Sequence, residues 1–308
     1  MAKKVWEKVK SGKFDRSVII GIIIAVLVIA LTLWGPLRKF RVAEEKKPVI
    51  QAQKQEPLQK KTAKKSKKDK KETKKHSESL VAGSYERTVP VAIVIDDLGQ
   101  DVKQAKEVLA LSGKITLAVL PGLAQSTSIA ELAKQSGREV LLHLPMEPLK
   151  NHEKTQSPGT LSANMTPMAF MNTVSEDLVS VPGAVGVNNH EGSALTENKE
   201  AMKFLMAELK ARNLFFLDSF TNPKSVAYAT AIEFGMKAAK RDVFLDNEGD
   251  NPAYIRKQLD ELVDIARKHG KAIGIGHPHP ATLSELRKWL AEIGAQGIEI
   301  VPVSRLMQ

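Results

Sequence analysis

The sequence of 308 residues contains no cysteine. This absence excludes disulfide bonds, thiolate zinc sites, iron–sulfur clusters and cysteine nucleophiles, whichever compartment the protein occupies. Any metal ion must therefore be bound by histidine and carboxylate side chains. A glycine-rich phosphate loop is also missing after the first expected strand, which argues against nucleotide binding.

Acidic residues are scarce in the first part of the chain, and this asymmetry produces the net charge of +11. Residues 1–87 contain 23 Lys and Arg but 9 Asp and Glu, whereas residues 88–308 contain 23 and 26. The basic character therefore belongs to the N-terminal region. The remaining chain of about 220 residues is long enough to form one domain with a sizeable core.

Long apolar runs are absent apart from Val18–Trp34, which carries no charge and is flanked by Arg16 and Arg38. Its length is near the minimum for crossing a bilayer, and no small-residue cleavage site follows it. We expect a basic flank over residues 1–17 and a single-pass cell-membrane anchor over residues 18–37 that contacts lipid. Positive charge on both sides leaves the orientation open, but single N-terminal spans most often place the following domain on the extracytoplasmic side.

Residues 38–87 form a Lys-rich segment that has too little apolar surface to fold, so we expect a disordered linker. The simplest interpretation is a solvated tether, and the alternative is contact with anionic lipid headgroups or an anionic wall polymer. A nucleic-acid partner is not expected, because the lysine run has no interleaved aromatic residues and no accompanying recognition fold.

From residue 88 onward, short apolar runs alternate with segments of helical pattern. Nearly continuous apolar runs are typical of parallel strands that are buried on both faces. Seven or eight such strands predict a distorted parallel (β/α) barrel over residues 88–308, with a doubly wound open sheet as the alternative. The runs are Val91–Ile95, Ile115–Leu120, Val140–Leu142, Ala184–Val187, Leu214–Leu217, Ala272–Ile275 and Ile298–Val301, with a weaker one at Met236–Ala239.

Capping residues predict three of the helices between these runs, and an apolar stripe predicts a fourth. Asn251-Pro252 and His269-Gly270 delimit a helix over Tyr254–Lys268, and Thr166-Pro167 begins another. An apolar stripe indicates a helix over Glu197–Arg212. A capping box at Thr282–Glu285 is expected to begin the last helix.

Polar side chains follow five of the expected strands. In an α/β barrel the C-terminal ends of the strands converge on the face where active sites form, so we predict one functional site from this group. The residues are Asp96 and Asp97, His143 and Glu147, Asn188, Asn189 and His190, Asp218 and Ser219, and His277 and His279.

The types of these residues favour metal-assisted hydrolysis of an amide or ester. Adjacent residues of a strand point in opposite directions, so we expect one of Asp96 and Asp97 to bind a metal while the other faces the substrate. One carboxylate and two imidazoles form a three-ligand site that leaves a position for water. The other carboxylate would then be the general base, and His277 would protonate the leaving group.

Six motifs together resemble the divergent polysaccharide deacetylase family over about residues 89–305. This family is distantly related to the carbohydrate esterase family four deacetylases, which remove acetyl groups from N-acetylated sugar polymers. The resemblance implies a distorted (β/α) barrel with a bound divalent metal, zinc being the expected ion. The motifs are Val91–Asp97, His143–Pro148, Val187–Ser193, Leu217–Ser219, Arg241–Asn247 and Ile275–Pro280.

The resemblance also implies residue roles. Asp96 resembles the general base, Asp97 and His143 resemble metal ligands, and His277 resembles the general acid. Glu147 stands where the family's second histidine ligand is expected, so the third ligand is Glu147 or His190. We prefer His190, since imidazole is the more usual partner of one Asp and one His, and Glu147 would then orient His143 or bind substrate. Substrate-binding or supporting roles are expected for Asn188, Asn189, Asp218, Arg241, Asp242 and His279.

The implied function is a membrane-anchored, metal-dependent deacetylase that acts on an N-acetylated glycan such as peptidoglycan or an exported polysaccharide. The missing second histidine motivates the alternative, a catalytically silent glycan-binding or envelope-assembly module on the same barrel.

Overall fold

The computed structural model describes residues 88–149 and 157–308. The expected flank, membrane anchor and Lys-rich linker lie outside the described residues. Within the described ranges, no helix is both long enough and apolar enough to cross a membrane.

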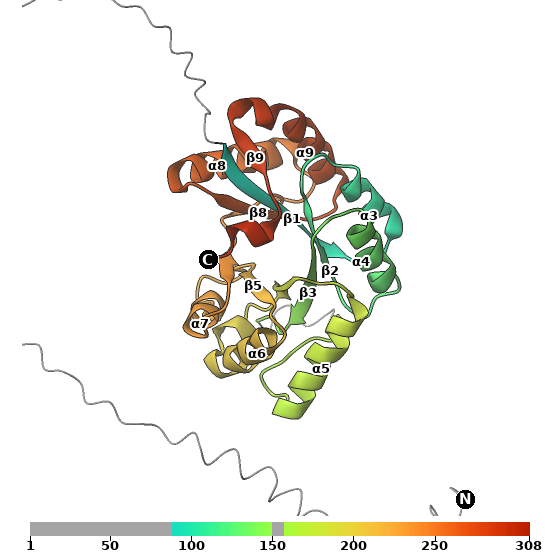
Figure 1. Cartoon of the computed structure of the whole chain (residues 1–308), viewed down its shortest axis with the longest axis vertical. Coiled ribbons are helices and arrows are strands. Elements are labelled where there is room, and N and C mark those ends of the chain that lie inside the picture. Colours follow the sequence, from blue (N-terminus) through green and yellow to red (C-terminus); the bar gives the residue numbers. More distant parts are fainter. Residues whose placement is uncertain (1–87, 150–156) are drawn as a thin grey trace, which may run out of the picture. The chain divides into compact units, whose positions relative to one another are not determined.

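Strands and helices alternate along the described chain, and the helices surround the strands (Figure 1). Neighbouring strands pair in parallel. The strands are β1 (Val89–Leu98), β2 (Thr116–Val119), β3 (Val140–Met146), β4 (Gly186–Glu191), β5 (Phe215–Asp218), β6 (Ala238–Lys240), β7 (Val243–Phe244), β8 (Ala272–Gly276) and β9 (Ile298–Ile300). The helices are α3 (Val102–Leu109), α4 (Ser126–Gln135), α5 (Pro167–Ser180), α6 (Lys199–Ala211), α7 (Ala227–Glu233), α8 (Pro252–His269) and α9 (Pro280–Glu292), with short 3-10 turns η2 (Leu195–Glu197), η3 (Ile293–Gln296) and η4 (Val303–Leu306).

The two strands at the ends of the sheet, β6 and β7, follow each other directly in the sequence. The hydrogen-bonded order is β6-β5-β4-β3-β2-β1-β8-β7, and β9 pairs with β1. Although β6 and β7 end this order on opposite sides, only Arg241 and Asp242 separate them in the chain. The sheet therefore curls back on itself, and the parallel half-barrel of eight strands supports the predicted barrel.

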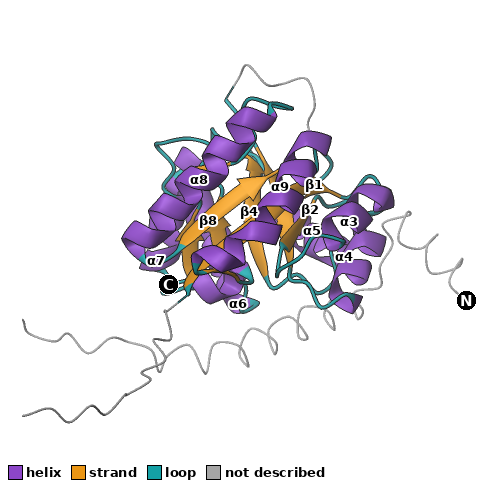
Figure 2. Cartoon of the chain, turned by 90° about the horizontal axis from the view of Figure 1, so that it is seen from above, coloured by secondary structure: helices purple, strands orange, loops and turns teal. Residues whose placement is uncertain are grey.

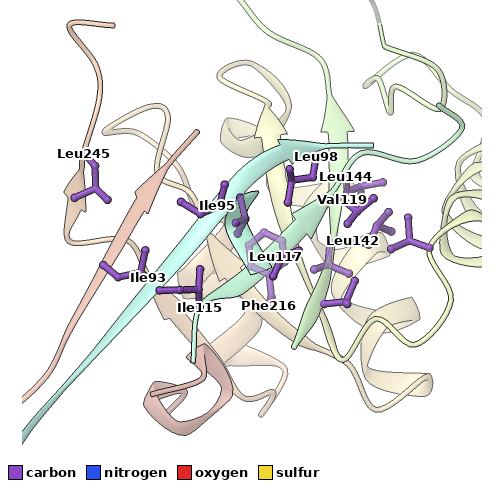
Figure 3. Close-up of a cluster of buried hydrophobic side chains, with 14 of the residues drawn as sticks. Ile93, Ile95, Leu98, Ile115, Leu117, Val119, Leu142, Leu144, Phe216 and Leu245 are labelled. Atoms are coloured by element: carbon purple, nitrogen blue, oxygen red, sulfur yellow. The ribbon is translucent and has the colours of Figure 1, made fainter. Parts of the chain in front are cut away.

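The core has two layers because both faces of the sheet are buried, as the apolar runs predicted. Alternate residues of β1, such as Ile93 and Ile95, face outward and pack with side chains of the covering helices. Figure 3 shows members of this outer layer from neighbouring strands in contact with one another. The intervening residues, such as Ala92 and Val94, belong to an inner cluster that also contains Val303 of η4.

The inner positions of the strands lead from the apolar core to polar side chains. After Val94 the next inner position of β1 is Asp96, and after Leu141 the next inner position of β3 is His143. The same alternation leads from Ile275 of β8 to His277. The apolar interior therefore supports a polar group at the C-terminal end of the barrel.

Three of the four predicted helices agree with the structure, two through their capping residues and one through its apolar stripe. Asn251 caps α8 through Tyr254 N, Thr166 caps α5 through Ala169 N, and α6 occupies the apolar-striped segment. The capping-box prediction at Thr282 is wrong, because α9 already begins at Pro280. Figure 2 shows α8 and α9 as two of the helices that flank the strands.

Two strand predictions also need correction. β1, β3 and β4 continue past their apolar runs, because Leu98 of β1 still pairs with Val119 of β2, and Met146 of β3 still pairs with Glu191 of β4. The polar residues Asp96, His143 and Asn188 therefore lie within strands and not after them. The two-residue strand β7 was not predicted, since it is too short to show a pattern.

Candidate active site

Asp96 and Asp97 lie at an irregularity of β1. Ile95 pairs with Leu117 and Leu98 with Val119, so β1 has one residue more than β2 in this interval. Asp97 adopts a φ of 57°, the left-handed region that few residues other than glycine occupy. A bulge of this kind changes the direction of a side chain.

Both carboxylates consequently approach the same imidazole. His143 Nε2 lies 3.6 Å from Asp96 Oδ2 and 3.2 Å from Asp97 Oδ1. The prediction that the two aspartates face opposite directions is therefore wrong, because the bulge interrupts the alternation that it assumed.

Asp97, His143 and His190 each direct one atom to a common point. Asp97 Oδ1 lies 3.2 Å from His143 Nε2 and 3.0 Å from His190 Nδ1, and the two nitrogens are 3.2 Å apart. Zinc ligands at about 2.0–2.1 Å in a tetrahedral arrangement lie about 3.3 Å from one another. Asp97 Oδ1 is buried and makes no well-aligned hydrogen bond to any described residue. The residue types and the spacing fit a divalent cation.

Asn188 of β4 holds the far side of the His143 ring. His143 Nδ1 lies 3.0 Å from Asn188 Oδ1, and both side chains are buried. A carbonyl oxygen only accepts hydrogen bonds, so Nδ1 carries a proton, and Nε2 is the ring nitrogen that faces Asp97 and His190.

Glu147 lies outside this group. Its carboxylate accepts a hydrogen bond of 2.9 Å from Ala163 N, and its backbone oxygen accepts from Leu195 N. Glu147 therefore fastens loops to the end of β3. The partner of His143 is Asn188, which corrects the expectation that Glu147 orients this ring.

His277 is held by a buried carboxylate that sequence reasoning did not select. Asp246 Oδ1 lies 2.9 Å from His277 Nδ1, and Asp246 Oδ2 accepts hydrogen bonds from His277 N and Thr282 Oγ1. His277 Nε2 faces the metal-ligand group, 3.8 Å from Asp97 Oδ2. Asp246 lies within the motif Arg241–Asn247, but β7 just before it is too short to show a strand pattern, so its position at a strand end was not recognised.

The environment shifts the pKa values of these groups. Burial lowers the pKa of His277, but the hydrogen bond and charge of Asp246 outweigh it and raise this pKa to about 9. Burial raises the pKa of Asp96 despite the opposing charge of His143. Burial also opposes ionisation of Asp97, yet His143 and His190 hold its pKa well below the usual range. At neutral pH the site therefore combines a protonated His277 with an ionised Asp97.

Two of the predicted supporting residues turn away from the site. Asp218 accepts hydrogen bonds from Ser225 Oγ and Tyr228 N, so it supports the beginning of α7. Asn189 donates to Glu191 O and accepts from Ser219 N. Alternation along the strand explains both, because each follows an inner position. For Asp218, the inner neighbour is Ser219, which accepts a hydrogen bond from Asn188.

The remaining predicted residues lie at different distances from the site. The Arg241 guanidinium stacks 4.4 Å above Phe244, whose ring in turn stacks on His277. His279 is exposed with its ring 5.6 Å from that of His277. Asp242 accepts from Ile273 N at the junction of β6 and β7 and does not belong to the site.

Comparison with known proteins agrees with these observations. Residues 93–307 match the family model described as divergent polysaccharide deacetylase. The uncharacterized protein YibQ of Escherichia coli (strain K12) is 40% identical over 217 residues, which cover 70% of this chain and 67% of YibQ. An uncharacterized protein of Haemophilus influenzae (strain ATCC 51907 / DSM 11121 / KW20 / Rd) is 36% identical over 216 residues, covering 70% of this chain and 76% of the relative. The solved structure of an uncharacterized protein from Agrobacterium tumefaciens C58 superposes with a TM-score of 0.68 at 29% identity, covering 71% of this chain and 89% of that one.

Proposed function

Because the chain belongs to the divergent polysaccharide deacetylase family, we propose that it is a metal-dependent hydrolase that removes acetyl groups from an N-acetylated polysaccharide. The observation that carries the proposal is the convergence of Asp97 Oδ1, His143 Nε2 and His190 Nδ1 to within 3.2 Å of one another. The buried carboxylate of Asp96 lies 3.6 Å from His143 Nε2 of this group, and His277 Nε2 lies 3.8 Å from Asp97 Oδ2.

Asp97, His143 and His190 would hold the cation, and the nitrogen and oxygen ligand set favours zinc. A cation bound there would supply Lewis-acid polarisation of the acetamide carbonyl.

Asp96 is suited to act as the general base. Asn188 Nδ2 donates a hydrogen bond of 2.9 Å to its Oδ1, which leaves Oδ2 on the side of the site. Burial raises its pKa, so its carboxylate is a stronger base than an exposed aspartate and accepts the proton of an attacking water more readily.

His277 is suited to act as the general acid. Its pKa of about 9 keeps it protonated at neutral pH, and Asp246 fixes the ring through Nδ1. His277 Nε2 would donate its proton to the amine nitrogen as the bond between nitrogen and the acetyl carbon breaks. The products are acetate and a free amino sugar.

We extend the proposal to the cellular setting on sequence grounds alone. The apolar segment within residues 18–37 would anchor the chain in the cell membrane, and the Lys-rich residues 38–87 would tether the barrel. An extracytoplasmic barrel would meet an envelope glycan such as peptidoglycan as its substrate.

The test uses the purified full-length chain with Asp97→Ala as the ligand variant. We expect about one equivalent of divalent metal per wild-type chain and release of acetate from chitooligosaccharides or peptidoglycan strands. Asp97→Ala should lose the metal and lower kcat/KM at least about 100-fold. Metal content is measured by elemental analysis and acetate by an enzymatic assay.

The matched control is Asp264→Ala, which removes an aspartate from the exposed face of α8. It should keep both metal and activity. A wild-type chain that binds glycan without releasing acetate, or an active Asp97→Ala variant, would refute the proposed reaction.

A further inference from the structure

We propose that Asn188 is a positioning residue that locks His143 in the tautomer able to bind a metal. The proposal rests on the proposed function only in taking Asp97, His143 and His190 as metal ligands. It assigns to a single buried amide the task of presenting the Nε2 lone pair of His143.

The contacts of Asn188 leave no freedom to its side chain. Its exposed surface is 0%, so no water reaches the amide. Oδ1 lies 3.0 Å from His143 Nδ1, whereas Nδ2 donates to Asp96 Oδ1 at 2.9 Å and to Ser219 Oγ at 3.1 Å. Three neighbours from three other strands or strand ends thus surround one amide.

The acceptors on the far side determine which end of the amide faces His143. Asn188 Nδ2 donates to Asp96 Oδ1 and to Ser219 Oγ, so the NH₂ end of the amide is held on the side away from His143. The carbonyl end is then left for His143, and a carbonyl oxygen requires a proton on Nδ1. The neutral ring with a proton on Nδ1 has its lone pair on Nε2, the atom closest to Asp97 Oδ1.

The other neutral tautomer of His143, with its proton on Nε2, would be unfavourable at both ring nitrogens. The proton on Nε2 would occupy the position that a cation needs. The unprotonated Nδ1 would place its lone pair against a lone pair of Asn188 Oδ1, and both atoms are buried. Metal-binding histidines in proteins commonly have their other nitrogen fixed by an acceptor, and loss of that acceptor typically weakens binding about 10- to 100-fold.

The neighbouring residue Asn189 provides a matched comparison. It has the same side chain on the same strand and is 1% exposed, but its amide bonds to Glu191 O and Ser219 N. It makes no hydrogen bond to His143 or Asp96 in the described chain. Asn189 therefore shares the burial and the chemistry of Asn188 but not the contact with His143.

The experiment measures zinc affinity of the full-length chain by competition with a chromophoric chelator. Asn188→Leu keeps the side-chain volume and removes the acceptor, and we expect zinc binding about 10- to 100-fold weaker. Asn188→Asp combined with Asp96→Asn keeps an oxygen opposite Nδ1 and an amide facing that new carboxylate, so this double variant should bind zinc within about threefold of wild type or more tightly.

Asn189→Ala is the control, because it also removes a buried amide from β4. Its unfolding midpoint should fall, as for Asn188→Leu, while zinc affinity should stay within about threefold of wild type. Circular dichroism and the unfolding midpoint show whether each variant is folded before its affinity is compared.

Four results would overturn the inference: unchanged zinc affinity in Asn188→Leu, equal loss in Asn188→Leu and in the double variant, equal loss in Asn189→Ala, or a wild-type chain without zinc affinity. The outcome is separate from the proposed reaction, because the expected order of affinities in a chain that releases no acetate would support the inference and refute the deacetylase.

Discussion

Single residues with unusual backbone angles surround the candidate site. Four residues other than glycine have positive φ in the described ranges, and three of them lie at the ends of β1, β4 and β5: Asp97, Glu191 and Phe220. Such conformations cost free energy and persist where the surrounding structure holds them. For Asp97, the unfavourable backbone conformation has a structural consequence, because it turns the carboxylate toward His143 and His190.

The pairing of Asp246 with His277 leads to a prediction at the same scale. Asp246→Asn removes the charge that raises the pKa of His277 to about 9, so this pKa should fall toward its ordinary value near 6.5. A histidine with a lower pKa loses its proton at lower pH, and the alkaline limb of kcat should move to lower pH. At pH 8 we expect kcat to fall about 10- to 100-fold in assays of acetate release.

Zinc affinity provides the control for this variant. Asp246 contacts His277 and Thr282 but none of the three proposed ligands. Asp246→Asn should therefore leave the zinc affinity of the Asp97, His143 and His190 group unchanged. A pH profile that matches wild type would show that Asp246 does not support the general acid.

Among the elements, the loop before α5 packs tightly against both the end of β3 and α5. Leu161 N donates to Pro145 O, and Glu147 N donates to Leu161 O, so the loop is paired with the end of β3 just beyond His143. Gly159 in the same loop has a φ of 73° and lies directly against the carboxylate of Asp177 on α5. The helix, the loop and the site strand are thus packed as one unit.

Gly159→Ala should disrupt this unit. The added methyl group would lie 2.1 Å from Asp177 Oδ1, a distance that requires the loop or the helix to move. Overpacking and the left-handed backbone together should reduce the free energy of unfolding by about 3 kcal/mol. Urea denaturation followed by far-UV circular dichroism measures this change.

Gly137→Ala separates the two contributions, because Gly137 has a similar φ of 66° but no atom within 4 Å of the added methyl group. Its cost should be about 1 kcal/mol. Adding Asp177→Ala to Gly159→Ala should recover part of the lost stability. Equal costs for the two glycine variants would contradict the close contact.

At the scale of the whole molecule, one buried carboxyl group makes stability depend on pH. Asp177 is 6% exposed, and its Oδ2 has no hydrogen-bond partner among the described residues. Burial, together with the nearby charge of Glu176, raises its pKa to about 7. In the unfolded chain the pKa of an aspartate is about 3.9.

The sign of the effect follows from proton binding. Between about pH 4 and pH 7 the folded chain keeps the Asp177 proton that the unfolded chain has lost, so this group's contribution to stability decreases as pH rises through that window. Asp177→Asn should remove the decrease and stabilise the protein by about 2 kcal/mol at pH 8. At pH 4 the variant and wild type should differ little.

The measurement is the urea midpoint at several pH values for wild type and Asp177→Asn. Glu176→Gln is the control, since it removes the neighbouring charge and should have a smaller effect of the same sign. Parallel pH profiles for wild type and Asp177→Asn would show that Asp177 titrates normally.

Much of the barrel could be predicted because its strands are buried on both faces. That burial makes runs such as Val91–Ile95 apolar throughout, and capping residues such as Thr166 and Asn251 mark the helices between them. Short or polar strand segments carry no such signal. For this reason the sequence does not predict β7, and it places His143 and Asn188 after their strands although they lie within them.

The site was predicted where residue type and strand position were sufficient. Asp97, His143 and His190 were grouped from sequence, and the folded chain brings their ligand atoms together. The sequence does not select Asp246, which contacts His277, and it selects Asp218, which turns away. Whether each carboxylate faces the site depends on the direction of its side chain. Strand pairing sets that direction, and the pattern of a single sequence does not reveal strand pairing.

Residue chemistry alone was enough to exclude thiolate sites, to separate the basic region from the barrel, and to select the histidines and carboxylates. Composition and local pattern govern these conclusions, and they do not depend on how distant segments meet. Only the tertiary structure decided that both aspartates face one histidine, that Asn188 holds this histidine, and that Asp246 holds His277. The bulge of β1 against β2 produces the first arrangement. The other two are contacts between residues that are 45 positions apart (His143 and Asn188) and 31 positions apart (Asp246 and His277). Such contacts form only when the sheet is assembled.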